Sequence, residues 1–77
     1  MRSKEIKDIR KRTRNSISTN LRKYRAAINI PQHELAKKVG LAQSVVARLE
    51  NGTRRMLAEE LPLFAEVLGV NVLELLD

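Results

Sequence analysis

The chain has 77 residues, enough for one small domain but not for two. It has no cysteine and one histidine, so disulfide bonds and zinc centres are not expected, and we predict no metal and no cofactor. The net charge of +6 is uneven, because residues 1–25 carry a net +8 and residues 26–77 a net −2. A concentrated positive segment favours a polyanionic partner, either nucleic acid or an anionic membrane.

Membrane insertion and export are not indicated. No stretch stays apolar for the roughly 18 residues that a membrane span needs, and the first residues lack the apolar core of a secretory signal. Residues 2–14 also lack the large aromatic or leucine face that binding to a membrane surface requires. We therefore expect a cytoplasmic protein with no membrane partner.

The first segment, residues 2–14, gives the weakest structural signal. Ile6 and Ile9 are its only apolar side chains among many charges, so disorder is the favoured interpretation. A helix continuous with the next one is the alternative, since several positions keep near-helical spacing, namely Ile6, Ile9 or Arg10, Thr13, Ile17 and Leu21. We accordingly treat residues 1–15 as a basic N-terminal arm, flexible or helical, and residues 16–77 as the folded domain.

Apolar residues at spacings of four, three and four then predict an amphipathic helix that ends before Asn29 and Pro31. These residues are Ile17, Leu21, Tyr24 and Ile28. The other face of this helix carries Arg22 and Lys23.

Two short helices should follow, joined by a tight turn. From Gln32 to Val39 the apolar residues recur at helical spacing, and Gly40 stands where helices often end in a left-handed residue. A second run of apolar residues begins at once and ends at Asn51 and Gly52, which have turn chemistry. Its members are Leu41, Val45, Val46 and Leu49.

Two further helices complete the chain. The apolar spacing of Leu61, Phe64, Ala65 and Leu68 predicts a fourth helix that ends at Gly69. Pro62 is tolerated only in a first turn, so we expect this helix to begin near Ala58 or Glu59. Glu59 and Glu60 would then stabilise its N-terminus through the helix dipole. A short, very apolar fifth helix contains Val72, Leu73, Leu75 and Leu76.

The segment of residues 32–52 closely resembles the helix-turn-helix of the Cro and phage-repressor family, the regulators also called xenobiotic-response-element-like. Five positions of the family pattern are matched, by Gln32, Ala36, Gly40, Val46 and Leu49. The resemblance runs without obvious gaps from Ser16 to the end of the chain. It implies an all-α, five-helix lambda-repressor-like DNA-binding domain with the helix-turn-helix at helices 2 and 3, close to the N-terminal domains of lambdoid phage repressors.

The resemblance also implies that the second helix of the motif lies in the major groove of double-stranded DNA. With Val46 and Leu49 facing inward, the groove side would carry the base-reading residues Gln43, Ser44, Ala47 and Arg48. The residues expected to bind phosphate are Gln32, Asn51, Arg54, Arg55 and Arg22. Arg25 and Glu50 match positions that form a structural ion pair in the family.

One domain of this size contacts too little DNA for high affinity, so we expect a homodimer on a palindromic operator, associated with the nucleoid. Repression by covering a promoter is the default outcome, although the same contacts could activate transcription beside the polymerase. The expected dimer surface contains Leu57, Leu73 and Leu76. The chain departs from the family at the residues before two helices, where Pro31 and Ala42 replace the usual serine or threonine caps. The starts of these helices could therefore shift by a residue.

One competing function stays open on the sequence. An antitoxin-like module of the same fold, or another protein-interaction module, would use the basic arm to bind an acidic protein and DNA only secondarily. RNA binding is disfavoured, because the two aromatic residues, Tyr24 and Phe64, lie at core positions. An enzyme is not expected, since nothing pairs a nucleophile with a base, and no small-molecule ligand is evident.

Overall fold

The computed structural model describes all 77 residues, and its secondary structure is entirely helical. Five α-helices and one 3-10 turn follow one another along the chain: α1 (Ser3–Ala27), α2 (Gln32–Val39), α3 (Gln43–Asn51), η1 (Ala58–Glu60), α4 (Leu61–Leu68) and α5 (Val72–Leu76). The predicted all-α, five-helix fold class is confirmed. None of these helices has both the length and the apolar character needed to cross a membrane.

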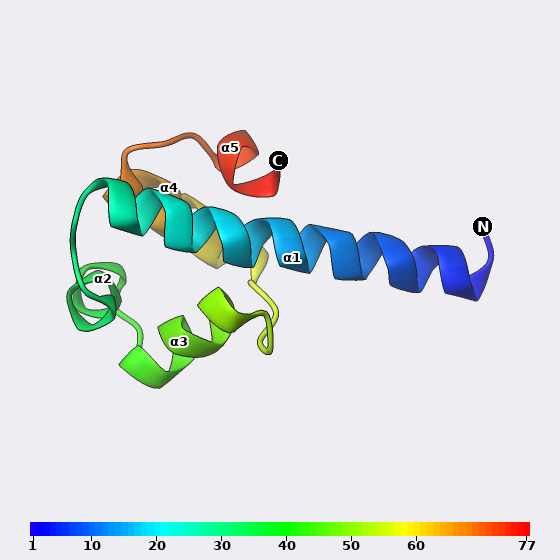
Figure 1. Ribbon diagram of the computed structural model, residues 1–77, viewed down its shortest axis with the longest axis horizontal. Coiled ribbons are helices and arrows are strands. Elements are labelled where there is room, and N and C mark those ends of the chain that lie inside the picture. The colour runs from blue at the N-terminus through cyan, green and yellow to red at the C-terminus, as the bar shows by residue number, and fades with distance from the viewer.

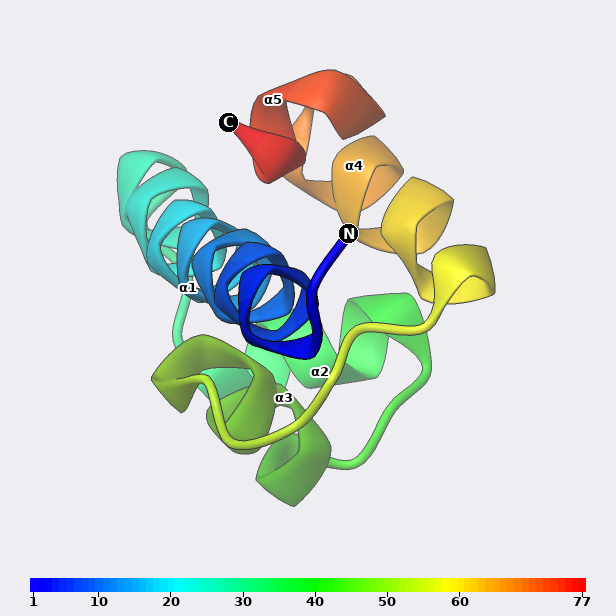
Figure 2. The ribbon, with the colours of Figure 1, turned by 90° about the vertical axis from the view of Figure 1, so that its right-hand side faces the viewer.

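The long helix α1 organises the arrangement (Figure 1). Its C-terminal half packs against α3, α4 and α5, whereas its N-terminal half projects beyond the rest of the molecule. Seen along α1, the pair α2 and α3 lies on one side of this helix, and α4 and α5 lie on another (Figure 2). The projecting half makes the molecule elongated, with principal extents of 40 × 23 × 20 Å.

The N-terminal segment is helical, so the favoured interpretation of residues 2–14 as disordered was wrong. Helix α1 runs without a break from Ser3 through residues 15 and 16 to Ala27. Most residues of its first half are lysine, arginine or glutamate, which lose little side-chain freedom in a helix, and Glu5 lies favourably in the first turn. The division into an arm and a domain at residue 15 is not marked by the backbone and stays a prediction.

The core gathers residues from all five helices. The largest fully buried side chains are Phe64, Leu21, Leu35, Leu49, Leu75 and Val46. Each of them contributes roughly 1.5–3 kcal/mol by leaving water. Helix α3 is thus held from beneath by Val46 and Leu49, and its opposite face is free to carry polar residues.

The turn between α2 and α3 depends on Gly40. Its φ of +76° is in the left-handed region that side chains rarely adopt, and the following Leu41 N–H donates to the carbonyl of Ala36 at 3.0 Å. The helices begin at Gln32 and Gln43, without the shift that the sequence left open. Pro31 and Ala42 stand at their N-caps and provide no side-chain hydrogen bond.

The start of the fourth helix differs from the prediction. At Ala58 and Glu59 the chain forms the 3-10 turn η1, and α4 itself begins at Leu61. The physical reason is Pro62, which has no N–H to donate to the Ala58 carbonyl, so that carbonyl accepts from the Leu61 N–H instead. The Glu60 side chain folds back onto this turn and accepts a hydrogen bond from the Leu57 N–H at 2.9 Å. Pro62 lies in the first turn of α4, as its missing N–H requires.

Candidate nucleic-acid interface

Helix α3 presents a polar face to solvent. Gln43, Ser44 and Arg48 are exposed and Ala47 is half-buried, opposite the buried Val46 and Leu49. The Arg48 Nε donates to the Ser44 carbonyl one turn earlier at 3.4 Å, so this guanidinium is not held by another element. The four residues predicted to read bases therefore share one accessible helix.

Beneath this face, Glu50 joins three helices. Glu50 is 2 % exposed, and its carboxylate accepts hydrogen bonds from Arg25 Nε at 2.6 Å and from Arg25 Nη2 at 2.9 Å. The Gln32 Nε2 donates to the same carboxylate at 3.0 Å. The ion pair implied by the family resemblance is therefore present, and its hydrogen bond raises the pKa of Arg25 above the usual value.

Two residues expected to bind phosphate take part in this network instead of standing free. Besides Gln32, Arg22 is engaged, because its Nη1 donates to the backbone carbonyl of Glu50 near the end of α3. Arg25 also donates through Nη1 to the Ile30 carbonyl at 2.9 Å, which ties down the segment before α2. These contacts fix α3 relative to α1 and α2, and phosphate binding by Gln32 and Arg22 stays a prediction.

Arg54 is held in an ion pair that the sequence interpretation missed. Its Nη1 and Nη2 donate to the two carboxylate oxygens of Glu60, at 2.8 and 3.1 Å. These hydrogen bonds hold the pKa of the buried Glu60 carboxyl below its usual value. The role expected for Glu60 was a dipole interaction at a helix start, and the role expected for Arg54 was phosphate binding. A local signal existed only for the contact of Glu60 with Leu57 and not for its pairing with Arg54, since a glutamate three residues after a helix N-cap can fold back onto it.

The other two predicted phosphate ligands are more accessible. Arg55 is exposed, and its side chain makes no hydrogen bond within the protein. The Asn51 Oδ1 accepts from the Thr53 N–H at 3.0 Å and from its hydroxyl at 2.6 Å, which shapes the turn after α3. The Asn51 amide nitrogen has no partner among these bonds, so it retains two N–H donors for an external acceptor.

A cavity of about 290 Å³ lies between α1 and the segment that follows α3. Its lining combines apolar residues with four arginines, and it includes Leu49 on the buried side of α3 rather than any residue of the polar face. The lining residues are Ile9, Arg10, Thr13, Arg14, Ile17, Leu49, Arg54, Arg55 and Met56.

The three leucines predicted for a dimer surface are all exposed. Their exposed fractions are 46 % for Leu57, 71 % for Leu73 and 37 % for Leu76. Leu75 between the last two is fully buried, and its carbonyl accepts from Asn20 Nδ2 at 3.0 Å. Helix α5 is therefore attached firmly to α1 while it presents apolar side chains outward.

Solved structures of similar shape are known. The clp gene regulator ClgR from Corynebacterium glutamicum superposes with a TM-score of 0.79 and 26 % sequence identity, over 83 % of this chain and 68 % of that chain. The hypothetical transcription factor NHTF from Neisseria superposes with a TM-score of 0.81 and 28 % identity, over 84 % of this chain and 73 % of that one.

The sequence itself matches a family profile described as helix-turn-helix over residues 21–75, which is most of the chain. This range holds α2 and α3 together with the parts of α1, α4 and α5 that form the core. The resemblance noted in the sequence is thereby confirmed. The chain belongs to the helix-turn-helix family of Cro and phage-repressor type, a family of DNA-binding transcription regulators.

Proposed function

We propose that this protein is a sequence-specific transcriptional repressor that inserts α3 into the major groove of operator DNA. The observation that carries the proposal is the accessible polar face of α3 with Gln43, Ser44 and Arg48, held in place by the Glu50 network. Gln43 has the donor and acceptor to pair with adenine, and Arg48 has the paired donors that suit guanine. Ala47 offers a methyl group to thymine.

The rest of the interface would bind the DNA backbone. The free donors of Asn51 and the unpaired guanidinium of Arg55 lie at and after the end of α3, where phosphates flank the groove. Gln32 and Arg22 would contact phosphate only with donors left over from the Glu50 network. The protein would act in the cytoplasm, associated with the nucleoid, and not as an enzyme.

The test is binding to a site selected from random DNA, compared with unselected DNA. Gln43→Ala and Arg48→Ala should each reduce the preference for the selected site by about 5- to 150-fold, the value of one bidentate contact of roughly 1–3 kcal/mol. Lys23→Ala, an exposed change on α1 away from α3, serves as the control and should keep the preference. If both α3 variants keep the full preference, the assignment of the reading face is refuted.

A second part of the proposal is dimerisation through Leu57, Leu73 and Leu76. One domain of this size contacts few base pairs, so tight binding requires two copies on half-sites roughly one helical turn apart, in a palindromic operator. Leu73→Glu should leave the fold intact, since this side chain is the most exposed of the three. It should abolish dimers in sedimentation and weaken operator binding. Dimers that persist in this variant would place the interface elsewhere.

A further inference from the structure

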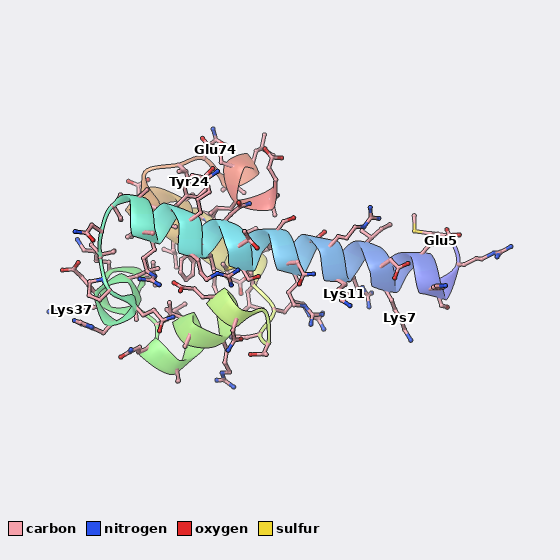
Figure 3. All side chains as sticks on the ribbon, in the orientation of Figure 1. Glu5, Lys7, Lys11, Tyr24, Lys37 and Glu74 are labelled. Carbon is pink, nitrogen blue, oxygen red and sulfur yellow. The ribbon has the colours of Figure 1, made fainter.

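The projecting half of α1 carries a regular row of basic residues. Lys4, Lys7, Lys11 and Arg14 are spaced three, four and three residues apart, which puts them on one face of the helix. We call these four residues the α1 basic row. The three lysines are exposed. Figure 3 shows Lys7 and Lys11 on the part of α1 that extends past the packed domain.

The contacts of the packed half show which way this row faces. The row continues at helical spacing through Ser18 to Arg22 and Arg25, and both arginines donate to Glu50 of α3. Ser18 also lies against the end of α3. Its Oγ is 3.6 Å from the point where the Cβ of any side chain at Gly52 would lie. The α1 basic row therefore lies on the side of α1 on which α3 is packed. Figure 3 agrees, with Lys7 and Lys11 on the α3 side of α1 and Glu5 on the opposite side.

Charge pairing along the helix does not account for this row. Like charges three and four residues apart on a helix repel one another. The two ion pairs of the structure are Arg25 with Glu50 and Arg54 with Glu60, so the neighbouring Glu5 and Asp8 neutralise none of the row. An external anionic surface would offset this repulsion.

We propose that the α1 basic row binds the phosphates of double-stranded DNA that flank the half-site, beyond the carboxyl end of α3. This inference rests on the proposed insertion of α3 into the major groove. With 1.5 Å per residue, the row from Lys4 to Arg14 is about 15 Å long, the length of roughly four base pairs. Because α1 is continuous and tied to α3 through Glu50, the direction of the row follows from the orientation of α1 relative to α3.

Charge-neutral variants on two faces of α1 test this proposal. Lys7→Gln with Lys11→Gln removes two charges from the α1 basic row. The control variant, Arg12→Gln with Lys23→Gln, removes two exposed charges from the face that carries Glu5. It therefore has the same net charge as the row variant. The row variant should bind the selected site roughly tenfold or more weakly at about 0.1 M salt, and the slope of log K against log salt should become shallower by about 1.8 per bound copy. The control should keep the wild-type slope to within a fraction of one phosphate contact.

A change of helical phase tests the direction without any change of charge. Two alanines inserted between Asn15 and Ser16 turn the row by about 200° about the helix axis, away from the α3 side. Four inserted alanines turn it by about 40° and keep it on that side. The two-residue insertion should weaken binding like the row variant, and the four-residue insertion should retain most of the wild-type salt slope. Circular dichroism checks that both remain helical.

The outcomes separate this inference from the proposed function. If the wild type prefers its selected site but the row and control variants have equal salt slopes, the α1 basic row does not bind phosphate, while the role of α3 stands. If the wild type shows no preference for any DNA, both proposals fail. Vesicles of phosphatidylserine and phosphatidylcholine provide the last comparison, and lysine-dependent binding to these vesicles without an effect on DNA would overturn the inference.

Discussion

Replacing Glu50 with alanine removes the carboxylate that accepts from Arg25 and Gln32 and leaves their donors without a partner inside the protein. Losing one member of a buried ion pair costs about 3–5 kcal/mol. The Arg25 side chain is 22 % exposed and recovers part of its hydration, so we expect the lower end, about 3 kcal/mol. A domain of this length has a free energy of unfolding of roughly 4–12 kcal/mol, so the loss is a large part of its stability.

Urea unfolding followed by circular dichroism measures the change in free energy, and thermal unfolding followed in the same way measures the change in midpoint. A loss of about 3 kcal/mol should lower the midpoint of thermal unfolding by roughly 12–24 °C in a domain of this size. Glu66→Ala, an exposed glutamate on α4, is the matched control and should stay within about 0.5 kcal/mol of the wild type. A loss below about 1 kcal/mol for Glu50→Ala would refute the argument that this carboxylate holds α1, α2 and α3 together. A double-mutant cycle with Arg25→Ala should give a coupling of at least about 1 kcal/mol.

Three further changes test other parts of the structure. Ala42→Ser should stabilise the protein by about 0.5–1 kcal/mol in urea unfolding, because the extended backbone at this N-cap suits a serine that accepts from α3. Leu75→Ala should cost about 2–5 kcal/mol, since this is the one fully buried side chain of α5. Glu60 has a lowered pKa in the folded protein, so its stabilising contribution is complete above its ordinary pKa of 4.5 and is lost as the pH falls through the lowered value. Glu60→Gln should therefore destabilise the protein near pH 7 and have a smaller effect in acid, as measured by urea unfolding across pH.

The parts of the fold that were predictable are those with local signals. The turn glycines Gly40, Gly52 and Gly69 each adopt positive φ and end a helix where the apolar spacing stops. Pro62 likewise defined the first turn of α4 within a few residues. These features depend on the backbone preferences of glycine and proline, which are known from the residue type alone.

The parts that were not predictable depend on distant contacts or on weak periodicity. Arg54 and Glu60 meet because the loop after α3 folds back, and no spacing rule pairs two residues across such a loop. The first half of α1 has little apolar periodicity, because the residues before Ile17 have almost no core to cover. On α3, the register of Val46 and Leu49 placed the polar residues outward, but which bases they contact depends on DNA that the chain does not specify.

The position of Ile17 also has a consequence for motion. It is the first buried residue of α1, so fraying of the helix from Ser3 to about Asn15 uncovers no core side chain. Apart from backbone hydrogen bonds, it breaks the exposed bond from the Thr13 hydroxyl to the Ile9 carbonyl. Amide protons in this stretch should exchange with solvent through small local openings, whereas those near Leu21 should exchange only when the whole domain unfolds. Neutralising the crowded positive charges would slow exchange in the first group and leave the second group unchanged.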